Sequence, residues 1–200
     1  MKIIIGCEFS GRVREAFRAL GHDAYSCDLL PAEDNSEFHI QDDVLNHLND
    51  GWDMAIFHPD CTYLCSSGLH WNGRVPGRAE KTEEALEFVR LLMAAPIKKI
   101  AIENPVGRIN TAIRNPDQYI QPYEYGHDAS KKTGLWLKNL PKLRPTKFIE
   151  PRIVNGKNRW ANQCDSGQNK IGPSPDRWKL RAATYQGWAD AMAEQYGGLA

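Results

Sequence analysis

The sequence lacks any long apolar run, and this absence limits what the chain can be. No uninterrupted apolar stretch approaches the ~18 residues that a membrane-spanning helix requires. The first twelve residues, MKIIIGCEFSGR, are too few and too polar for a secretory signal peptide. We therefore expect a cytoplasmic protein with no membrane partner.

The cysteines lack the pattern of a disulfide framework. Five are present, at positions 7, 27, 61, 65 and 164, an odd number with irregular spacing. We expect free thiols in a reducing compartment. His58, Cys61, Cys65 and His70 could together supply two sulfur and two nitrogen ligands. Their spacing differs from the paired ligands of structural zinc sites, so we predict no metal.

Net charge is also absent, since 25 basic residues balance 25 acidic ones, but the two signs are unevenly distributed. Residues 131–181 hold 13 Lys or Arg and only 3 Asp or Glu, and Trp136, Phe148, Trp160 and Trp178 are interleaved with them. A solvated loop surface could carry such a stretch. A surface that faces phosphate and stacks bases is the interpretation we favour.

Alternating strand and helix patterns predict an α/β fold, a doubly wound and mostly parallel sheet. Strands are expected at 2–9, 23–29, 53–58, 98–105, 118–125 and 133–140. A helix capped by Ser10 and ended by Gly21, a short helix at 42–48 and a helix capped by Thr82 lie between them. We predict one domain over 1–200, with an irregular basic region at 106–181 and a C-terminal helix at 184–197 that Thr184 caps.

Polar residues follow four of the predicted strands, in EFSGR, CDLLP, HPDCTYLC and ENP. Ligands of open α/β sheets bind beyond the carboxyl ends of the strands, so we expect these four segments to converge. The first turn lacks the G-x-G-x-x-G fingerprint of a pyrophosphate cradle. Asp28 stands where such folds place an acid that binds ribose hydroxyls, although a helix cap or a surface acid is an equal alternative. Together these features predict a nucleoside-type cofactor without a diphosphate.

Cys61 allows three interpretations from the residues alone: a packed thiol, a metal ligand or a nucleophile. Its place in a polar, proline-bounded loop favours the nucleophile, which needs a depressed pKa or a nearby base. Glu103, at the end of the next strand, is the candidate acid, and burial there is expected to raise its pKa so that it donates a proton. Asp60 beside Cys61 is expected to raise the thiol's pKa unless it points away.

These residues resemble the DNA (cytosine-5)-methyltransferases, and in length the short, phage-type members. That family has a Pro-Cys loop with a small residue at +4 and glycine at +7, as at Cys65 and Gly68, then a helix and a Glu-Asn strand end like IENP. CEFSG resembles the family's first S-adenosylmethionine loop, Asp28 its ribose acid and Asp43 its adenine-contacting acid. The resemblance covers about residues 1–105 in order and, more weakly, the last helix. The family's large target-recognition domain has no counterpart.

The resemblance implies a Rossmann-like methyltransferase fold and a set of site residues. The implied catalytic residues are Cys61, Glu103 and Asn104. The implied S-adenosyl-L-methionine contacts are Glu8, Phe9, Ser10, Gly11, Asp28, Leu29, Asp43, Val44, His58 and Pro59. The implied substrate contacts are Ser66, Gly68, Arg108, Lys131, Lys132 and Thr133.

The predicted function is methyl transfer to C5 of cytosine in DNA through a covalent Cys61 adduct. The partner is duplex DNA with a flipped cytosine, and the missing recognition domain implies short or relaxed sequence specificity. Two alternatives stay open: the same chemistry on a free pyrimidine nucleotide, and a non-catalytic protein of this fold that binds nucleic acid or another partner. The sequence does not predict an oligomeric state.

Overall fold

Seven strands form one sheet in the computed structural model, which describes residues 1–175 and 177–199. Residue 176 of the predicted basic region and residue 200 lie outside the described residues. The strands are β1 (Lys2–Gly6), β2 (Asp23–Asp28), β3 (His39–Gln41), β4 (Met54–Phe57), β5 (Lys99–Pro105), β6 (Gln118–Ile120) and β7 (Thr133–Lys138).

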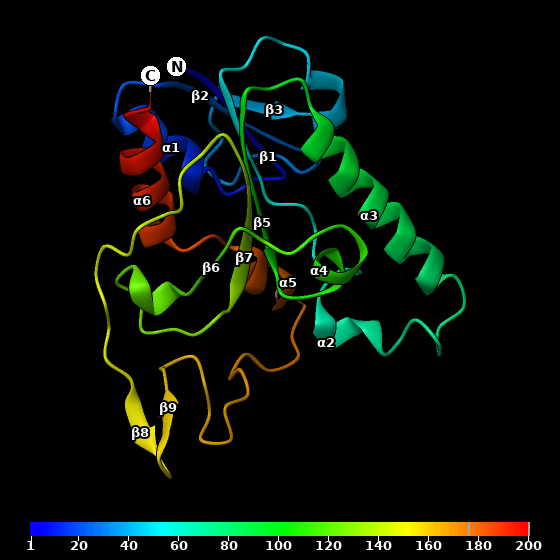
Figure 1. Ribbon diagram of the computed structural model, residues 1–200, viewed down its shortest axis with the longest axis vertical. Coiled ribbons are helices and arrows are strands. Elements are labelled where there is room, and N and C mark those ends of the chain that lie inside the picture. The colour runs from blue at the N-terminus through cyan, green and yellow to red at the C-terminus, as the bar shows by residue number, and fades with distance from the viewer. Residues whose placement is uncertain (176, 200) are drawn as a thin grey trace.

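The sheet has the order β3-β2-β1-β4-β5-β7-β6 (Figure 1). Its first five strands are mutually parallel, whereas β7 runs antiparallel to both β5 and β6. The predicted doubly wound, mostly parallel α/β fold is therefore confirmed. Because β1, β2, β4 and β5 are parallel, the loops that follow them leave from one edge of the sheet.

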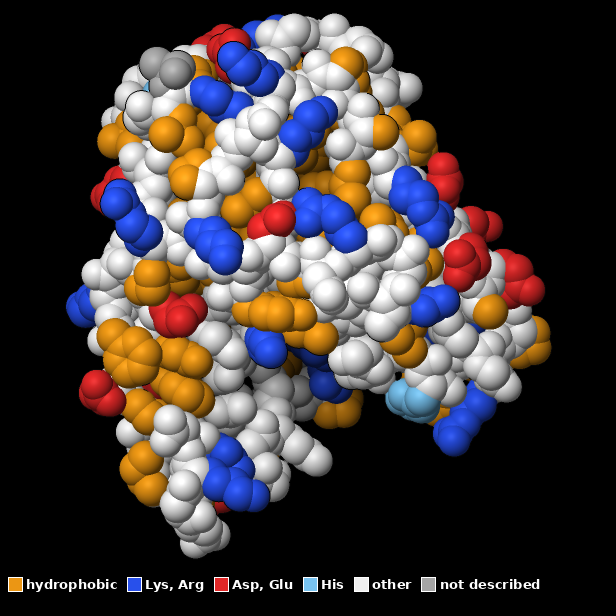
Figure 2. Space-filling model, in the orientation of Figure 1, with side chains coloured by type: hydrophobic (Ala, Val, Ile, Leu, Met, Phe, Trp, Pro, Cys, Tyr) orange, Lys and Arg blue, Asp and Glu red, His pale blue; other side chains and the backbone are white. Residues whose placement is uncertain are grey.

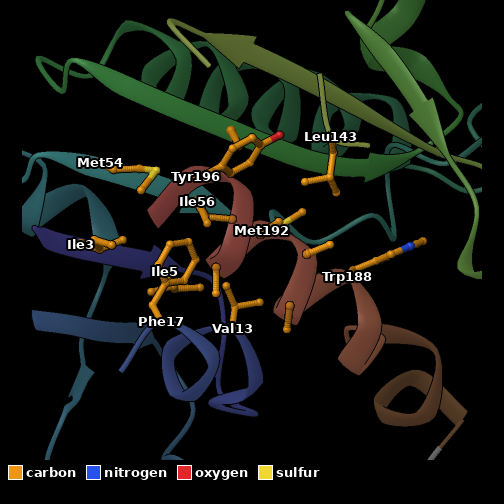
Figure 3. Close-up of a cluster of buried hydrophobic side chains, with 14 of the residues drawn as sticks. Ile3, Ile5, Val13, Phe17, Met54, Ile56, Leu143, Trp188, Met192 and Tyr196 are labelled. Carbon is orange, nitrogen blue, oxygen red and sulfur yellow. The ribbon is translucent and has the colours of Figure 1, made fainter. Parts of the chain in front are cut away.

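Alternate residues of β1 pack on opposite faces of the sheet, as the pleat requires. Ile3 and Ile5 pack against α1 (Arg12–Ala19) and α6 (Gln186–Gly197), with Phe17 and Met192 in the same fully buried cluster (Figure 3). Ile4 packs on the other face, with buried residues of α3 (Arg78–Ala94) and α4 (Arg108–Ala112). Each such side chain contributes roughly 1.5–3 kcal/mol through burial.

The remaining elements are short and lie mainly around the edge of the sheet (Figure 1). They are the 3₁₀ helices η1 (Val44–His47) and η2 (Pro122–Glu124), the helices α2 (Ser66–Leu69) and α5 (Arg177–Ala182), and the hairpin β8 (Arg152–Val154) with β9 (Lys157–Arg159). The hairpin projects at the end of the molecule opposite both termini (Figure 1).

Three helix starts differ from the sequence prediction. α1 is preceded by Gly11 at φ 71°, a left-handed conformation that glycine adopts readily, and Ser10 is not the cap. α3 begins at Arg78, so Thr82 lies inside the helix and donates its hydroxyl to the Tyr63 carbonyl at 3.1 Å. α6 begins at Gln186 after Tyr185, rather than after Thr184.

Other predicted elements were wrong in type or extent. The segment 42–48 forms the 3₁₀ helix η1 instead of an α-helix, and 121–125 leaves the sheet after β6 to form η2. β3 was not predicted, because three half-exposed residues give no apolar run. Of the aromatics expected on a nucleic-acid surface, Trp136 is buried in the core and Trp160 stacks on Tyr123 at 4.1 Å between ring centroids.

Candidate active site

The loop that carries Cys61 is fixed to the loop that follows β5. Asn104 donates its side-chain amide to the Pro59 carbonyl at 2.7 Å, and the Arg108 backbone N–H donates to the Leu64 carbonyl at 2.7 Å. A Cβ at Gly107 would stand 2.0 Å from that carbonyl oxygen, so only glycine permits this approach. The cysteine loop is therefore held against the strand end that carries Glu103.

A cavity of about 370 Å³, which we name the inner cavity, opens at this edge of the sheet. Its walls come from the loops after β1, β4 and β5, from the segment before β7 and from residues 179–185. The residues that matter here are Glu8, Phe9, Ser10, His58, Pro59, Cys61, Glu103, Asn104, Lys131 and Arg181. Cys61 and Glu103, predicted from the sequence as nucleophile and acid, thus line the same space.

Two further cavities adjoin the inner cavity and share residues with it. The carboxylate cavity, about 300 Å³, is bounded by Cys7, Asp28, Leu29, Asp43, Val44, Pro59, Tyr63 and Phe88. The outer cavity, about 870 Å³, is bounded by His58, Cys61, Cys65, Gly68, Trp71, Arg78, Arg177, Trp178 and Arg181, among others. The four predicted strand ends therefore converge on three connected spaces.

A buried polar cluster lies between the inner cavity and the sheet. His58 Nδ1 is 3.0 Å from Glu103 Oε2, and both side chains are more than nine-tenths buried. Among the described residues, His58 Nε2, Glu103 Oε1 and Asn104 Oδ1 have no hydrogen-bond partner. Leaving a buried polar atom unpaired costs about 1–3 kcal/mol, so three together indicate a surface built to receive a polar ligand.

The charge of Glu103 differs from the sequence prediction. Burial raises the pKa of its carboxyl, but the Lys131 ammonium and the hydrogen-bonded His58 outweigh burial and hold the pKa below its ordinary value. Glu103 is therefore an anion at neutral pH and accepts hydrogen bonds. The expected raised pKa was wrong, because the sequence does not show that the charge of Lys131 acts on this carboxyl.

The two cysteines of the loop differ in protonation. The pKa of Cys61 is raised by its hydrogen bond to Cys65 and by burial, with a smaller contribution from Asp60. The pKa of Cys65 is lowered, first by that same hydrogen bond and further by the Ser67 hydroxyl and the Gly68 N–H. Cys61 is therefore a thiol at rest. Of these two cysteines, Cys61 lines both the inner and the outer cavity, whereas Cys65 lines the outer one alone.

Comparison with known proteins adds little to this geometry. No family model and no curated protein matches the sequence. Similar solved structures include a prophage-encoded protein described as a DNA modification methyltransferase (E. coli), at 14% identity and a TM-score of 0.44. Another is the methyltransferase EhMeth of Entamoeba histolytica, at 16% identity and a TM-score of 0.49.

The matched regions cover 74% of this chain but only 51% and 57% of those two proteins. The chain therefore spans little more than half the length of either. The fold class follows from the strand order and directions described above.

Most of the residues predicted for cofactor binding line these cavities. Glu8 borders the inner cavity, but its carboxylate accepts the backbone N–H groups of Val13 at 2.8 Å and Arg14 at 3.3 Å. Its carboxylate therefore satisfies two free N–H groups at the start of α1, a role predicted for Ser10. Gly11 shapes the preceding turn and borders none of the three cavities.

Two of the six residues predicted to contact the substrate line a cavity, and four do not. Gly68 lines the outer cavity and Lys131 the inner one. The others border none of the three cavities: Ser66, Arg108, Lys132 and Thr133. Lys132 instead places its ammonium over the Tyr119 ring, 4.2 Å from the centroid, and the Thr133 side chain is buried in β7. A DNA-contacting role for these four stays a prediction.

The sequence prediction missed the contribution of α5. Arg177, Trp178 and Arg181 form one wall of the outer cavity, and Trp178 packs on Phe9 with ring centroids 5.9 Å apart. Figure 2 shows a notch in this end of the molecule, between the part that carries the hairpin and the part that carries α2, with Lys or Arg side chains inside it. The sequence feature that could have indicated this wall is composition, since Trp178 belongs to the basic and aromatic stretch 131–181.

No group of three or more His, Cys, Asp or Glu side chains in 1–175 and 177–199 is arranged to hold a metal ion. All five cysteines are free thiols. Over the same residues, every helix is too short or too polar to cross a membrane.

Proposed function

We propose that the protein transfers a methyl group from S-adenosyl-L-methionine to C5 of cytosine in DNA, through a covalent adduct at Cys61. One observation carries the proposal: Cys61 and Glu103 line one cavity, beside a second cavity that holds Asp28 and Asp43. A cysteine sulfur, a carboxylate and a cavity bounded by two further carboxylates adjoin at the carboxyl edge of the sheet, which supports a nucleophile beside a cofactor site.

The residues of the carboxylate cavity fit the nucleoside part of that cofactor. The Asp28 carboxylate is fixed by the Leu30 N–H at 2.9 Å, which suits an acceptor for ribose hydroxyls. Val44 and Phe88 provide apolar wall for a purine ring. Pro59 and Cys7 border both this cavity and the inner cavity, so a bound molecule could extend from one into the other. When bound, S-adenosylmethionine supplies an electrophilic methyl group.

The residues of the inner cavity account for the selection and activation of the base. The sulfur of Cys61 adds to C6, and electron density moves to C5 and N3. The Glu103 carboxylate accepts a hydrogen bond from the exocyclic amino group, because it is an anion, and the Lys131 ammonium offsets the negative charge that develops on the ring. Uracil or thymine would place a carbonyl oxygen against this carboxylate, so the site favours cytosine.

The outer cavity provides a route for a nucleotide strand. Trp71 and Trp178 are about half exposed, at 46% and 55%, and both line this cavity together with Arg78, Arg177 and Arg181. Aromatic faces stack bases and guanidinium groups bind phosphate. Removing a cytosine from a duplex costs a few kcal/mol, and contacts of this kind offset that cost.

The proposal is tested by trapping with a DNA oligonucleotide that contains 5-fluorocytosine, because fluorine at C5 prevents release of Cys61. We expect a covalent protein–DNA adduct that requires S-adenosylmethionine, and a fall of about 10³-fold or more in the rate of its formation in Cys61→Ser. Cys65→Ser is the matched control and should still form the adduct, because Cys65 does not line the inner cavity.

Transfer of labelled methyl to duplex DNA, single-stranded DNA and dCMP, measured in parallel, identifies the substrate. Label in dCMP but in neither DNA would move the activity to a free nucleotide. Adduct formation that persists in Cys61→Ser, or the absence of both adduct and label with every substrate, would overturn the proposal.

A further inference from the structure

We propose that His58 is a catalytic base that takes the proton of the Cys61 thiol, with its ring held for that role by Glu103. The inference rests on the proposed function for the identity of the substrate, but the thiol, imidazole and carboxylate arrangement is a property of the chain. The sequence resemblance assigned His58 only to cofactor binding.

The geometry of the imidazole provides the first support. Nδ1 is 3.0 Å from Glu103 Oε2, and the His58 backbone N–H donates to the Gly6 carbonyl at 3.0 Å, so both the ring and its backbone are fixed. Nε2 is buried, and among the described residues it has no hydrogen-bond partner. One ring nitrogen is thus engaged, and the other is buried and unpaired among the described residues.

The position of that imidazole provides the second support. His58 and Cys61 lie three positions apart on the loop after β4, and both line the inner and the outer cavity. Glu103 also lines the inner cavity, from the neighbouring strand β5. Nucleophile, base and orienting carboxylate are the three parts of activated-nucleophile sites in general.

The charge of Glu103 determines which nitrogen of His58 can act as base. Because the carboxylate is an anion, it accepts the Nδ1–H of the neutral imidazole, and this tautomer leaves the lone pair on Nε2. When Nε2 takes a proton, the resulting imidazolium is stabilised by the same carboxylate. Burial raises the pKa of the Glu8 carboxyl on the β1 side above its ordinary value, so the stabilising negative charge is that of Glu103.

Cys61 needs such a base. Its pKa is raised by Cys65, by burial and by Asp60, and is lowered only in part by Lys131, so little thiolate forms unaided at neutral pH. In the proposed step the S–H bond breaks and its proton moves to His58 Nε2. The sulfur electron pair forms the S–C6 bond, and the C5–C6 π pair moves onto C5 and N3. The step needs no oxidant or further reactant.

Alkylation of Cys61 by iodoacetamide tests this role without any nucleic acid or cofactor. The full-length protein keeps Cys65 in every sample, because its hydrogen bond is the largest cause of the raised Cys61 pKa. Fragment ions of the loop peptide separate alkylation at Cys61 from alkylation at Cys65. We expect His58→Ala to lower the alkylation rate at pH 7 at least tenfold. The deficit should close as the pH is raised and the thiol ionises without help.

Two further measurements separate a base from a structural histidine. Imidazole added to His58→Ala should restore both the alkylation rate and the rate of 5-fluorocytosine adduct formation, in proportion to its concentration. His22→Gln is the matched control, since His22 lies between α1 and β2 and borders none of the three cavities, and its rates should not change. Circular dichroism and the thermal midpoint verify folding.

Equal alkylation rates at pH 7 in His58→Ala and in the protein that retains His58 would overturn the role of His58. A slower rate in His58→Ala with an unchanged pH profile and no rescue by imidazole would also overturn it. The outcome is distinguishable from failure of the proposed function. If no methyl transfer and no DNA adduct are found, the thiol measurement still decides whether His58 activates Cys61.

Discussion

At the residue scale, the charge of Glu103 depends on Lys131. Burial alone would favour the neutral acid, but Lys131 and His58 lower the pKa of the carboxyl below its ordinary value. A carboxyl with a lowered folded-state pKa stabilises the fold above its unfolded pKa, and that contribution is lost as the pH falls through the folded value. The anion therefore contributes to the stability of the fold, and the proposed catalysis requires it.

Lys131→Met should therefore raise the pKa of Glu103 and move the acid limb of the pH–rate profile to higher pH. We also expect the rate at pH 7 to fall, because an ammonium that offsets charge on the base is lost. Adduct formation with 5-fluorocytosine DNA, measured between about pH 4 and 8, reports both effects.

Lys132→Met is the control for that experiment, because it removes the same charge one residue away from a side chain that lies on Tyr119. Its acid limb should coincide with that of the unmodified protein. If Lys131→Met leaves the acid limb where it was, the assignment of Glu103 as an anion held by Lys131 is wrong.

At the element scale, α5 joins parts of the molecule that are distant in sequence. Lys179 pairs with Glu33 at 2.7 Å, and Trp178 packs on Phe9. Just after α5, the Thr184 carbonyl accepts a hydrogen bond from the Arg12 guanidinium at 2.7 Å. These contacts hold six residues of helix over the site, where Trp178 still exposes 55% of its surface to the outer cavity.

Trp178→Ala should weaken substrate binding more than chemistry. Loss of one base-stacking face costs about 1–3 kcal/mol, so we expect KM for DNA to rise by roughly 5- to 150-fold while kcat changes little. Phe148→Ala is the matched control, since Phe148 is also 55% exposed but borders none of the three cavities. A change confined to kcat, or an equal effect in both variants, would contradict this role for α5.

The central elements could be predicted from the sequence and the peripheral ones could not. Strands β1, β4 and β5 are buried on both faces over nearly their whole length, so their apolar runs are continuous and easily recognised. The start of α1 depends on a carboxylate that folds back from Glu8, and α5 has too few residues for a periodic signal. Neither the start of α1 nor helix α5 can therefore be predicted from a local sequence pattern.

In the candidate site, too, the sequence predicts the contacts that the central strands determine but not those made by peripheral segments. Phe57 pairs with Ile102 in the parallel β4–β5 ladder, so the next residues, His58 and Glu103, lie side by side, and the sequence could have predicted their contact. Lys131 approaches Glu103 from the segment before the antiparallel strand β7. No spacing in the sequence places it there, and for this reason the direction of the Glu103 pKa shift was predicted wrongly.

At the scale of the whole molecule, the Lys and Arg residues of the basic stretch 131–181 are not equally available to the proposed DNA substrate. The chain has no net charge, yet 13 of its 25 Lys and Arg residues lie in 131–181. Only part of that excess is available to phosphate. On the hairpin, Arg152 pairs with Asp165 at 2.6 Å, and Arg159 donates to the Asp165 carbonyl at 3.0 Å. Arg177 and Arg181, by contrast, line the outer cavity.

The salt dependence of DNA binding should distinguish these two pairs of arginines. Each phosphate contact contributes about −0.9 to the slope of log K against log salt concentration. The double variant Arg177→Gln, Arg181→Gln should therefore flatten the slope by about 2 and weaken binding most at low salt. The double variant Arg152→Gln, Arg159→Gln removes the same charge and should change the slope much less, because Asp165 already engages both guanidinium groups. Fluorescence anisotropy with a labelled duplex between about 50 and 300 mM salt measures both slopes, and equal flattening in the two variants would show that binding follows overall charge rather than the cavity formed by α5.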